Sequence, residues 1–210
     1  MRLPQPRATL WLLGITSAAW FVAAFLGVSD QLGIAAGFIP ARLEGMIIPG
    51  AVPLWLTPLT ATLLHAGIIH LGFNMLMLGY CGRFSEYALG SRGLIILYLI
   101  GAYAAAFAQY LSGPFNQVPM VGASGAISAV VGAYALLFSQ RKGRAVGHPL
   151  GHWLHVAQLA AAWIFVQLLV GFATIGSNMS IAVAAHIGGF IAGLLLARPL
   201  LMWRERRLLG

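Results

Sequence analysis

Six long apolar stretches constrain this chain more than any other feature. They lie at about residues 8–28, 61–81, 93–111, 121–138, 153–172 and 181–200. Each is close to the ~20 residues that an α-helix needs to cross ~30 Å of hydrocarbon. Only 8% of the residues are charged, whereas an average soluble domain has about 25%. The sequence therefore predicts an all-α polytopic membrane protein with six transmembrane helices, forming a single domain over residues 1–210.

The basic residues predict the orientation of these helices. Of the 12 Lys and Arg residues, all but Arg42 lie before the first stretch, at or beyond the end of the last, or in the second–third and fourth–fifth connections. The positive-inside rule then places both termini in the cytoplasm and the connections 29–60, 112–120 and 173–180 outside. The net charge of +8 does not indicate nucleic-acid binding, because these residues occupy short connections and not one face of a soluble element.

The first stretch and the connection after it both belong to the membrane domain. The first stretch exceeds the 7–15 apolar residues of a signal peptide and lacks a clear small-residue cleavage site, so it is expected to remain as a helix. Residues 29–60 are rich in Gly and Pro around an amphipathic centre, which predicts a loop lying in the outer interface.

The chain has no carboxylate at membrane depth. All its acidic residues fall in connections or at helix ends, namely Asp30, Glu44, Glu86 and Glu205. This excludes a membrane aspartyl protease, which needs two buried carboxylates, and an HExxH zinc protease. It also argues against a proton-coupled transporter, as does the lack of an internal repeat.

No cofactor or metal is expected. Three histidines near the cytoplasmic fourth–fifth connection have spacing that could suggest a metal site, namely His148, His152 and His155. They lie beside basic residues in a connection, where histidines are more often solvated. We therefore predict that they bind no metal.

Ser124 lies near the outer start of the fourth stretch, in "MVGASGAIS". Ser128 and Gly132 follow on the same helical face, making a strip of small residues on which another helix could pack closely. The sixth stretch is the natural partner, because His186, Gly189 and Gly193 share one of its faces. Taken alone, Gly-Ala-Ser-Gly could be packing material and nothing more.

Serine becomes an effective nucleophile only when a neighbouring base takes its proton. His186 lies about 7.5 Å inside the outer end of the sixth stretch at 1.5 Å per residue, which matches the depth of Ser124. We therefore predict Ser124 as nucleophile and His186 as base. Because no buried acid exists to orient the imidazole, the pair must act as a dyad.

The oxyanion of a tetrahedral intermediate needs hydrogen-bond donors. His70 and Asn74 share one face of the second helix in its outer half, and the backbone N–H of Ser124 lies near a helix N-terminus. These three groups are the candidate donors. His70 and Asn74 could equally hold helices together by hydrogen bonds, as polar residues in membrane bundles often do.

These motifs together resemble the rhomboid intramembrane serine proteases. They read His65-x4-His70-x3-Asn74, Gly122-x-Ser124-Gly125 and Ala185-His186-x-x-Gly189-x3-Gly193, and the likeness covers about residues 50–200. The resemblance implies the six-helix rhomboid fold with a Ser124–His186 dyad. It also implies that His70 and Asn74 line the oxyanion hole and that Gly122 shapes the same loop.

The resemblance further implies a serine endopeptidase of the bacterial inner membrane that cleaves transmembrane segments of other proteins near the outer face. Its partners would be transmembrane protein substrates and the lipid bilayer. The fifth stretch and the "TIGSNMS" loop after it resemble the family's proposed lateral gate and cap. The alternative is a rhomboid-like pseudoprotease that binds transmembrane clients without cutting them. The sequence specifies neither the natural substrate nor the oligomeric state.

Two positions depart from the family pattern. Many members carry a Trp-Arg pair in the first loop, where this chain reads Trp55-Leu56-Thr57. Many also have an aromatic residue four positions after the nucleophile, where this chain has Ser128. The expected consequences are a first loop without its usual arginine and a histidine without the usual stacked ring.

Overall fold

The computed structural model describes residues 5–146, 154, 157–165 and 182–209. Over these residues the chain is helical and forms no strand; its only β-type pairing is an isolated bridge between Phe38 and Met120. Within this described part of the chain, three helical runs are long and apolar enough to cross a membrane, namely Arg7–Phe25, Ile68–Ser112 and Val183–Leu209. The all-helical membrane architecture is confirmed, whereas the number of six transmembrane helices is not.

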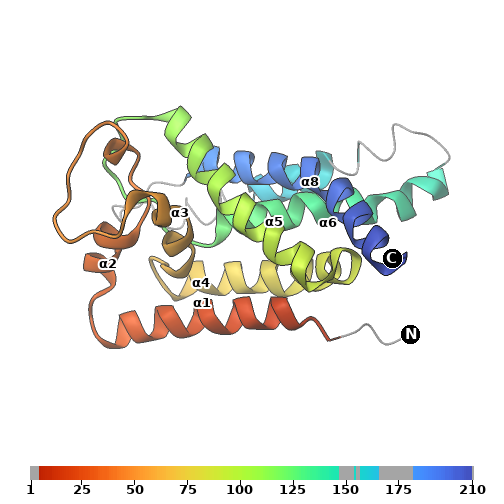
Figure 1. The fold of residues 1–210 in the computed structure, drawn as a ribbon, viewed down its shortest axis with the longest axis horizontal. Helices are drawn as coiled ribbons and strands as arrows, with labels where there is room; N and C mark the ends of the chain where they lie inside the picture. The colour runs from red at the N-terminus through yellow and green to blue at the C-terminus, as the bar shows by residue number, and fades with distance from the viewer. Residues whose placement is uncertain (1–4, 147–153, 155–156, 166–181, 210) are drawn as a thin grey trace.

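The second and third predicted helices form one helical run, and its single break, at Gly90, lies within the connection expected between them. Helix α4 (Ile68–Met77) begins later than residue 61 and continues through a π-helical turn, η4 (Leu78–Gly82), into α5 (Arg83–Ser112). The expected connection is helical until Gly90, whose φ of 74° and ψ of 165° are not helical. Figure 1 shows α5 turning back across α4, so this run contains both predicted helices.

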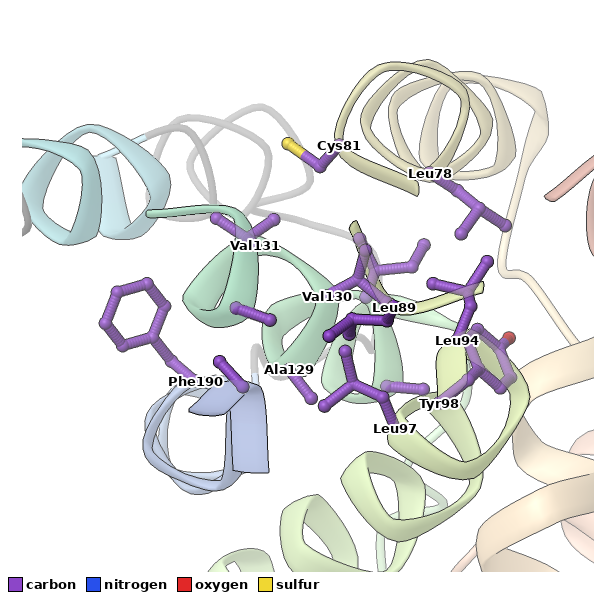
Figure 2. Close-up of a cluster of buried hydrophobic side chains, with 14 of the residues drawn as sticks. Leu78, Cys81, Leu89, Leu94, Leu97, Tyr98, Ala129, Val130, Val131 and Phe190 are labelled. Carbon is purple, nitrogen blue, oxygen red and sulfur yellow. The ribbon is translucent and has the colours of Figure 1, made fainter. Parts of the chain in front are cut away.

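The core lies where α5, α6 (Ser124–Val146) and α8 (Val183–Leu209) meet. Figure 2 shows Leu94 and Leu97 of α5 packed against Val130 of α6, with Ala129 facing the side of Phe190 on α8. Residues 124–133 of α6 are all buried. The predicted fourth helix is therefore the central one of the bundle, and its first residue is Ser124.

Small residues set the distance between α6 and α8. A Cβ atom at Gly189 would lie 2.1 Å from the carbonyl oxygen of Gly125, and one at Gly193 would lie 2.0 Å from that of Ala129. Side chains never approach a backbone so closely, so only glycine allows this contact. The predicted packing of the sixth helix on the small-residue strip of the fourth is confirmed. It brings the first turns of the two helices together.

Helix α1 (Arg7–Phe25) is attached to α5 through Glu86. The residue before α1 is Pro6, which provides no side-chain cap. The Glu86 carboxylate instead accepts hydrogen bonds from the backbone N–H groups of Ala8 (2.9 Å) and Thr9 (2.8 Å) and from the Thr9 hydroxyl (2.7 Å). The Ser91 hydroxyl donates a further bond of 2.6 Å. A carboxylate from a distant helix thus satisfies the free N–H groups at the start of α1.

The long connection contains short helices at the end of the bundle where α6 and α8 begin (Figure 1). In chain order these are α2 (Ser29–Ala36), η1 (Pro40–Arg42), η2 (Leu54–Leu56), α3 (Thr57–Thr60) and η3 (Ala61–Leu63). The first described turn of α1 and the last turn of α8 lie at the opposite end. The two ends of the described chain therefore share one side.

Arg42 anchors this connection. Its Nη2 atom donates to the carbonyl oxygen of Val52 at 3.0 Å, ten residues along the chain. The neighbouring backbone N–H of Ala41 donates to the carbonyl of Asn116 at 3.0 Å. Trp55, by contrast, is 68% exposed. The chain has no arginine directly after Trp55, and within the first loop it is Arg42 that bonds to the backbone.

Candidate active site

The backbone before Ser124 is held by the segment that precedes α4. The N–H of Gly122 donates to the carbonyl of Ala61 at 2.9 Å, and the N–H of Ala123 donates to His65 Nε2 at 3.4 Å. The sequence predicts His65 on the second helix, but in the structure it lies in the break before α4. These bonds fix the loop from which Ser124 starts α6.

Ser124 and His186 are in hydrogen-bond contact. His186 Nε2 lies 2.7 Å from Ser124 Oγ, and the two side chains are 5% and 7% exposed. His186 lies in the first turn of α8 and Ser124 in the first turn of α6, so the helix packing described above brings them together. Among the described residues, His186 Nδ1 has no hydrogen-bond partner. No carboxylate therefore orients the imidazole within that part of the chain.

Gly122 brings His70 close to the Ser124 hydroxyl. A Cβ atom on Gly122 would lie 2.7 Å from His70 Cε1, 2.8 Å from His70 Nε2 and 3.6 Å from Ser124 Oγ. Its φ of +120° is also a conformation that other residues rarely adopt. The His70 ring is supported on its other side by an edge contact with His65, at 5.0 Å between centroids. The structure thus brings three predicted site residues, His70, Gly122 and Ser124, to one place.

Asn74 is buried one helical turn beyond His70. Its side-chain Nδ2 donates to the carbonyl oxygen of His70 at 3.0 Å. In the described structure Asn74 makes no hydrogen bond to Ser124 or His186. One of its N–H groups is therefore used within α4, and the second remains for another acceptor.

Trp163 and Ser128 contact the site in a way that the sequence did not predict. Together with His65, His70, Asn74, Gly122, Ser124 and His186 they form what we call the cluster. Trp163 lies in the helical segment 157–165, and its indole N–H donates to Ser128 Oγ at 2.7 Å. Ser128 Oγ donates in turn to the carbonyl of Ser124 at 2.8 Å. The indole also meets the His186 ring edge to face, with centroids 6.4 Å apart and planes at 69°. No spacing in the sequence links Trp163 to either residue, because it belongs to another helix.

Other expectations lie wholly or partly beyond the described residues. His148, His152 and His155 are outside them, so the prediction that they bind no metal stays a prediction. Within the described part, no group of three or more His, Cys, Asp and Glu side chains could hold a metal ion. The loop that resembles a cap, and much of the fifth stretch, also lie outside.

Comparison with known proteins shows the family of this chain. The Rhomboid domain family model matches residues 54–203, well over half of the chain. The chain belongs to the rhomboid family. The matched range contains every residue of the cluster, from His65 to His186, and omits most of the long connection.

Curated relatives of this rhomboid are named as proteases. It is 30% identical to rhomboid protease GlpG of Photorhabdus laumondii over 147 residues, which are 70% of this chain and 46% of that protein. It is 32% identical to rhomboid protease GluP of Bacillus subtilis over 198 residues, 93% of this chain and 36% of that protein. The chain thus spans less than half the length of these relatives.

Proposed function

We propose that this rhomboid is an intramembrane serine endopeptidase that cleaves transmembrane segments of membrane proteins with a Ser124–His186 dyad. The observation that carries the proposal is the 2.7 Å contact between Ser124 Oγ and His186 Nε2 at two packed helix N-termini. A serine hydroxyl in contact with a buried imidazole is the arrangement that activates a nucleophile. The protease names of the relatives support the same activity.

The proposed reaction begins when Ser124 Oγ attacks the scissile carbonyl and His186 Nε2 takes the hydroxyl proton. The imidazolium then gives this proton to the leaving amine, which departs as the C–N bond breaks and leaves an acyl-enzyme. Water attacks the ester with His186 again as base, and the proton returns to Ser124 Oγ as the acid product leaves. Nothing in these steps requires a metal or a cofactor.

The oxyanion is proposed to be stabilised by His70 and by the backbone N–H of Ser124. The His70 ring lies against Gly122, directly beside the nucleophile. The first N–H groups of α6 have no helical partner and lie at the positive end of its dipole. Asn74 is the third candidate donor through the N–H that it does not use within α4. Gly122 contributes by leaving room for His70.

The substrate is proposed to be a helix that unwinds locally. Peptide bonds inside a transmembrane helix are hydrogen-bonded and hidden, so Ser124 can reach one only where the helix opens, which is easier at Gly or Pro. With both termini in the cytoplasm, as the basic residues predict, the site at the opposite end of the bundle would face the outer side of a bacterial inner membrane.

The test uses purified protein in proteoliposomes with a model transmembrane substrate that contains Gly and Pro. Wild type should cleave it, whereas Ser124→Ala and His186→Ala should lose nearly all activity. Ser112→Ala is the matched control, because this exposed serine at the end of α5 bonds only to its own helix. Cleavage by Ser124→Ala at the wild-type rate would contradict the dyad.

A covalent label separates the protease from the client-binding alternative. A fluorophosphonate should attach to wild type and to Ser112→Ala but not to Ser124→Ala. If wild type binds the substrate, takes no label and cleaves nothing, the pseudoprotease interpretation holds instead.

A further inference from the structure

We propose that Trp163 is a positioning residue that sets the orientation of His186 and of the first turn of α6. This inference rests on the proposed function, since it concerns the same site. It is carried by two contacts of one buried side chain: the indole N–H bonds to Ser128, and the indole ring meets the His186 ring.

The first contact links Trp163 to the nucleophile. Ser128 has a single hydroxyl proton, which it donates to the carbonyl of Ser124, so its oxygen is free to accept the indole N–H. Ser128 is fully buried and Trp163 is 3% exposed. A buried chain of two bonds thus connects the helical segment 157–165 to the first turn of α6. Losing either member would leave a buried polar group without its partner.

The second contact limits the rotation of the imidazole. His186 is fixed at Nε2 by Ser124, but its Nδ1 has no partner among the described residues. A ring held at one atom can still swing about that bond. The indole and imidazole rings, with centroids 6.4 Å apart and planes at 69°, lie within the range of favourable aromatic pairs, and this contact opposes the swing. Trp163 therefore performs an orienting task that a carboxylate performs in aqueous triads.

Three variants separate the two contacts. Trp163→Leu removes both the ring and the donor, and Trp163→Phe keeps a ring but removes the donor. Ser128→Ala removes the acceptor of the indole N–H together with the hydroxyl that donates to the Ser124 carbonyl. Trp11→Leu is the matched control, because Trp11 on α1 is 71% exposed and far from the cluster. Thermal unfolding shows which variants are folded; if Trp163→Leu is not, Trp163→Phe and Ser128→Ala carry the test.

The kinetic result expected is a loss of kcat with KM unchanged, because a positioning residue acts on the reacting groups and not on substrate binding. Trp163→Leu should lower kcat by about two- to tenfold, the range that an aromatic pair supports. Trp163→Phe should recover part of this loss. Combining Trp163→Phe with Ser128→Ala should cost no more than Ser128→Ala alone, since Ser128→Ala already breaks the bond that Trp163→Phe removes. Trp11→Leu should match wild type.

A spectroscopic readout tests the geometry without activity. The indole N–H signal of Trp163, assigned by its disappearance in Trp163→Phe, should move in Ser128→Ala while the other indole signals stay in place. If this signal does not move, or if Trp163→Leu cleaves as fast as wild type, the positioning role is wrong. If wild type itself neither cleaves nor labels at Ser124, the proposed function has failed and the inference falls with it.

Discussion

Gly122 shows how much one residue can control at this site. It is the only residue of the Gly122–Gly125 motif with a positive φ, and it is the only one whose missing side chain makes room for His70. The sequence motif identifies the position of this glycine, but the reasons why a glycine is needed there come only from the structure. The two constraints, conformation and space, both exclude a side chain there.

We expect Gly122→Ala to abolish most cleavage while the protein still folds. The added Cβ would push the His70 ring away from the nucleophile, and losing an oxyanion donor costs about 10²- to 10³-fold in kcat. The measurement is kcat on the model transmembrane substrate. Gly72→Ala is the control, because a Cβ there meets nothing within 4 Å. Wild-type kcat in Gly122→Ala would contradict the placement of His70 in the oxyanion site.

At the scale of elements, the packing of α8 on α6 determines whether a site exists at all. Ser124 and His186 are 62 positions apart in the chain and meet only because Gly189 and Gly193 let the two helices approach. Helix packing in membranes relies on such close contact, since lipid offers no hydrophobic driving force between helices.

We expect Gly193→Ala to lower the free energy of unfolding by about 1–3 kcal/mol, the usual cost of overpacking a tight contact. The new Cβ would meet the backbone of Ala129, which cannot rotate away as a side chain can. Unfolding in mixed micelles measures the effect. Gly14→Ala on α1, where a Cβ meets nothing, is the control and should be neutral. Equal stability of the two variants would show that α6 and α8 are not so tightly packed.

The attachment of α1 is the second prediction at this scale. Glu86→Gln keeps the shape of the side chain but removes the charge that accepts four hydrogen bonds. We expect a loss of about 1.5–3 kcal/mol in unfolding free energy, the range for hydrogen bonds to charged groups. Exposed Glu205→Gln is the control. A Glu86→Gln variant as stable as wild type would mean that α1 is held by apolar contacts alone.

At the scale of the whole molecule, the two ends of the bundle have different chemistry. One end carries the cluster and the long connection, and the other carries the ends of the described chain and its terminal arginines. The positive-inside rule assigns the arginine-rich end to the cytoplasm.

Cysteine labelling in whole cells tests this orientation. The native Cys81 is 3% exposed and should not react. A membrane-impermeant maleimide should label Ile47→Cys, which lies in the long connection and is 87% exposed, but not Glu205→Cys near the other end. After the membrane is permeabilised, both should be labelled. Labelling of Glu205→Cys in intact cells would reverse the proposed orientation.

Composition and local pattern along the chain were enough to predict several features of this protein. Long apolar runs require helices in a membrane, the absence of carboxylates within those runs limited the chemistry to Ser and His, and the small residues marked the faces on which α6 and α8 pack. Each of these follows from residues within one helix, so a pattern along the chain is enough to indicate it.

Contacts between segments that are distant in the chain could be assigned only from the three-dimensional structure. In the structure His65 lies in the break before α4, η4 continues directly into α5, and Arg42 anchors the first loop. The structure also places Trp163 against His186, where the chain has Ser128 in place of a ring. Nothing in the spacing of these residues predicts such contacts, because side chains of different helices meet according to the rotation and depth of each helix in the bundle.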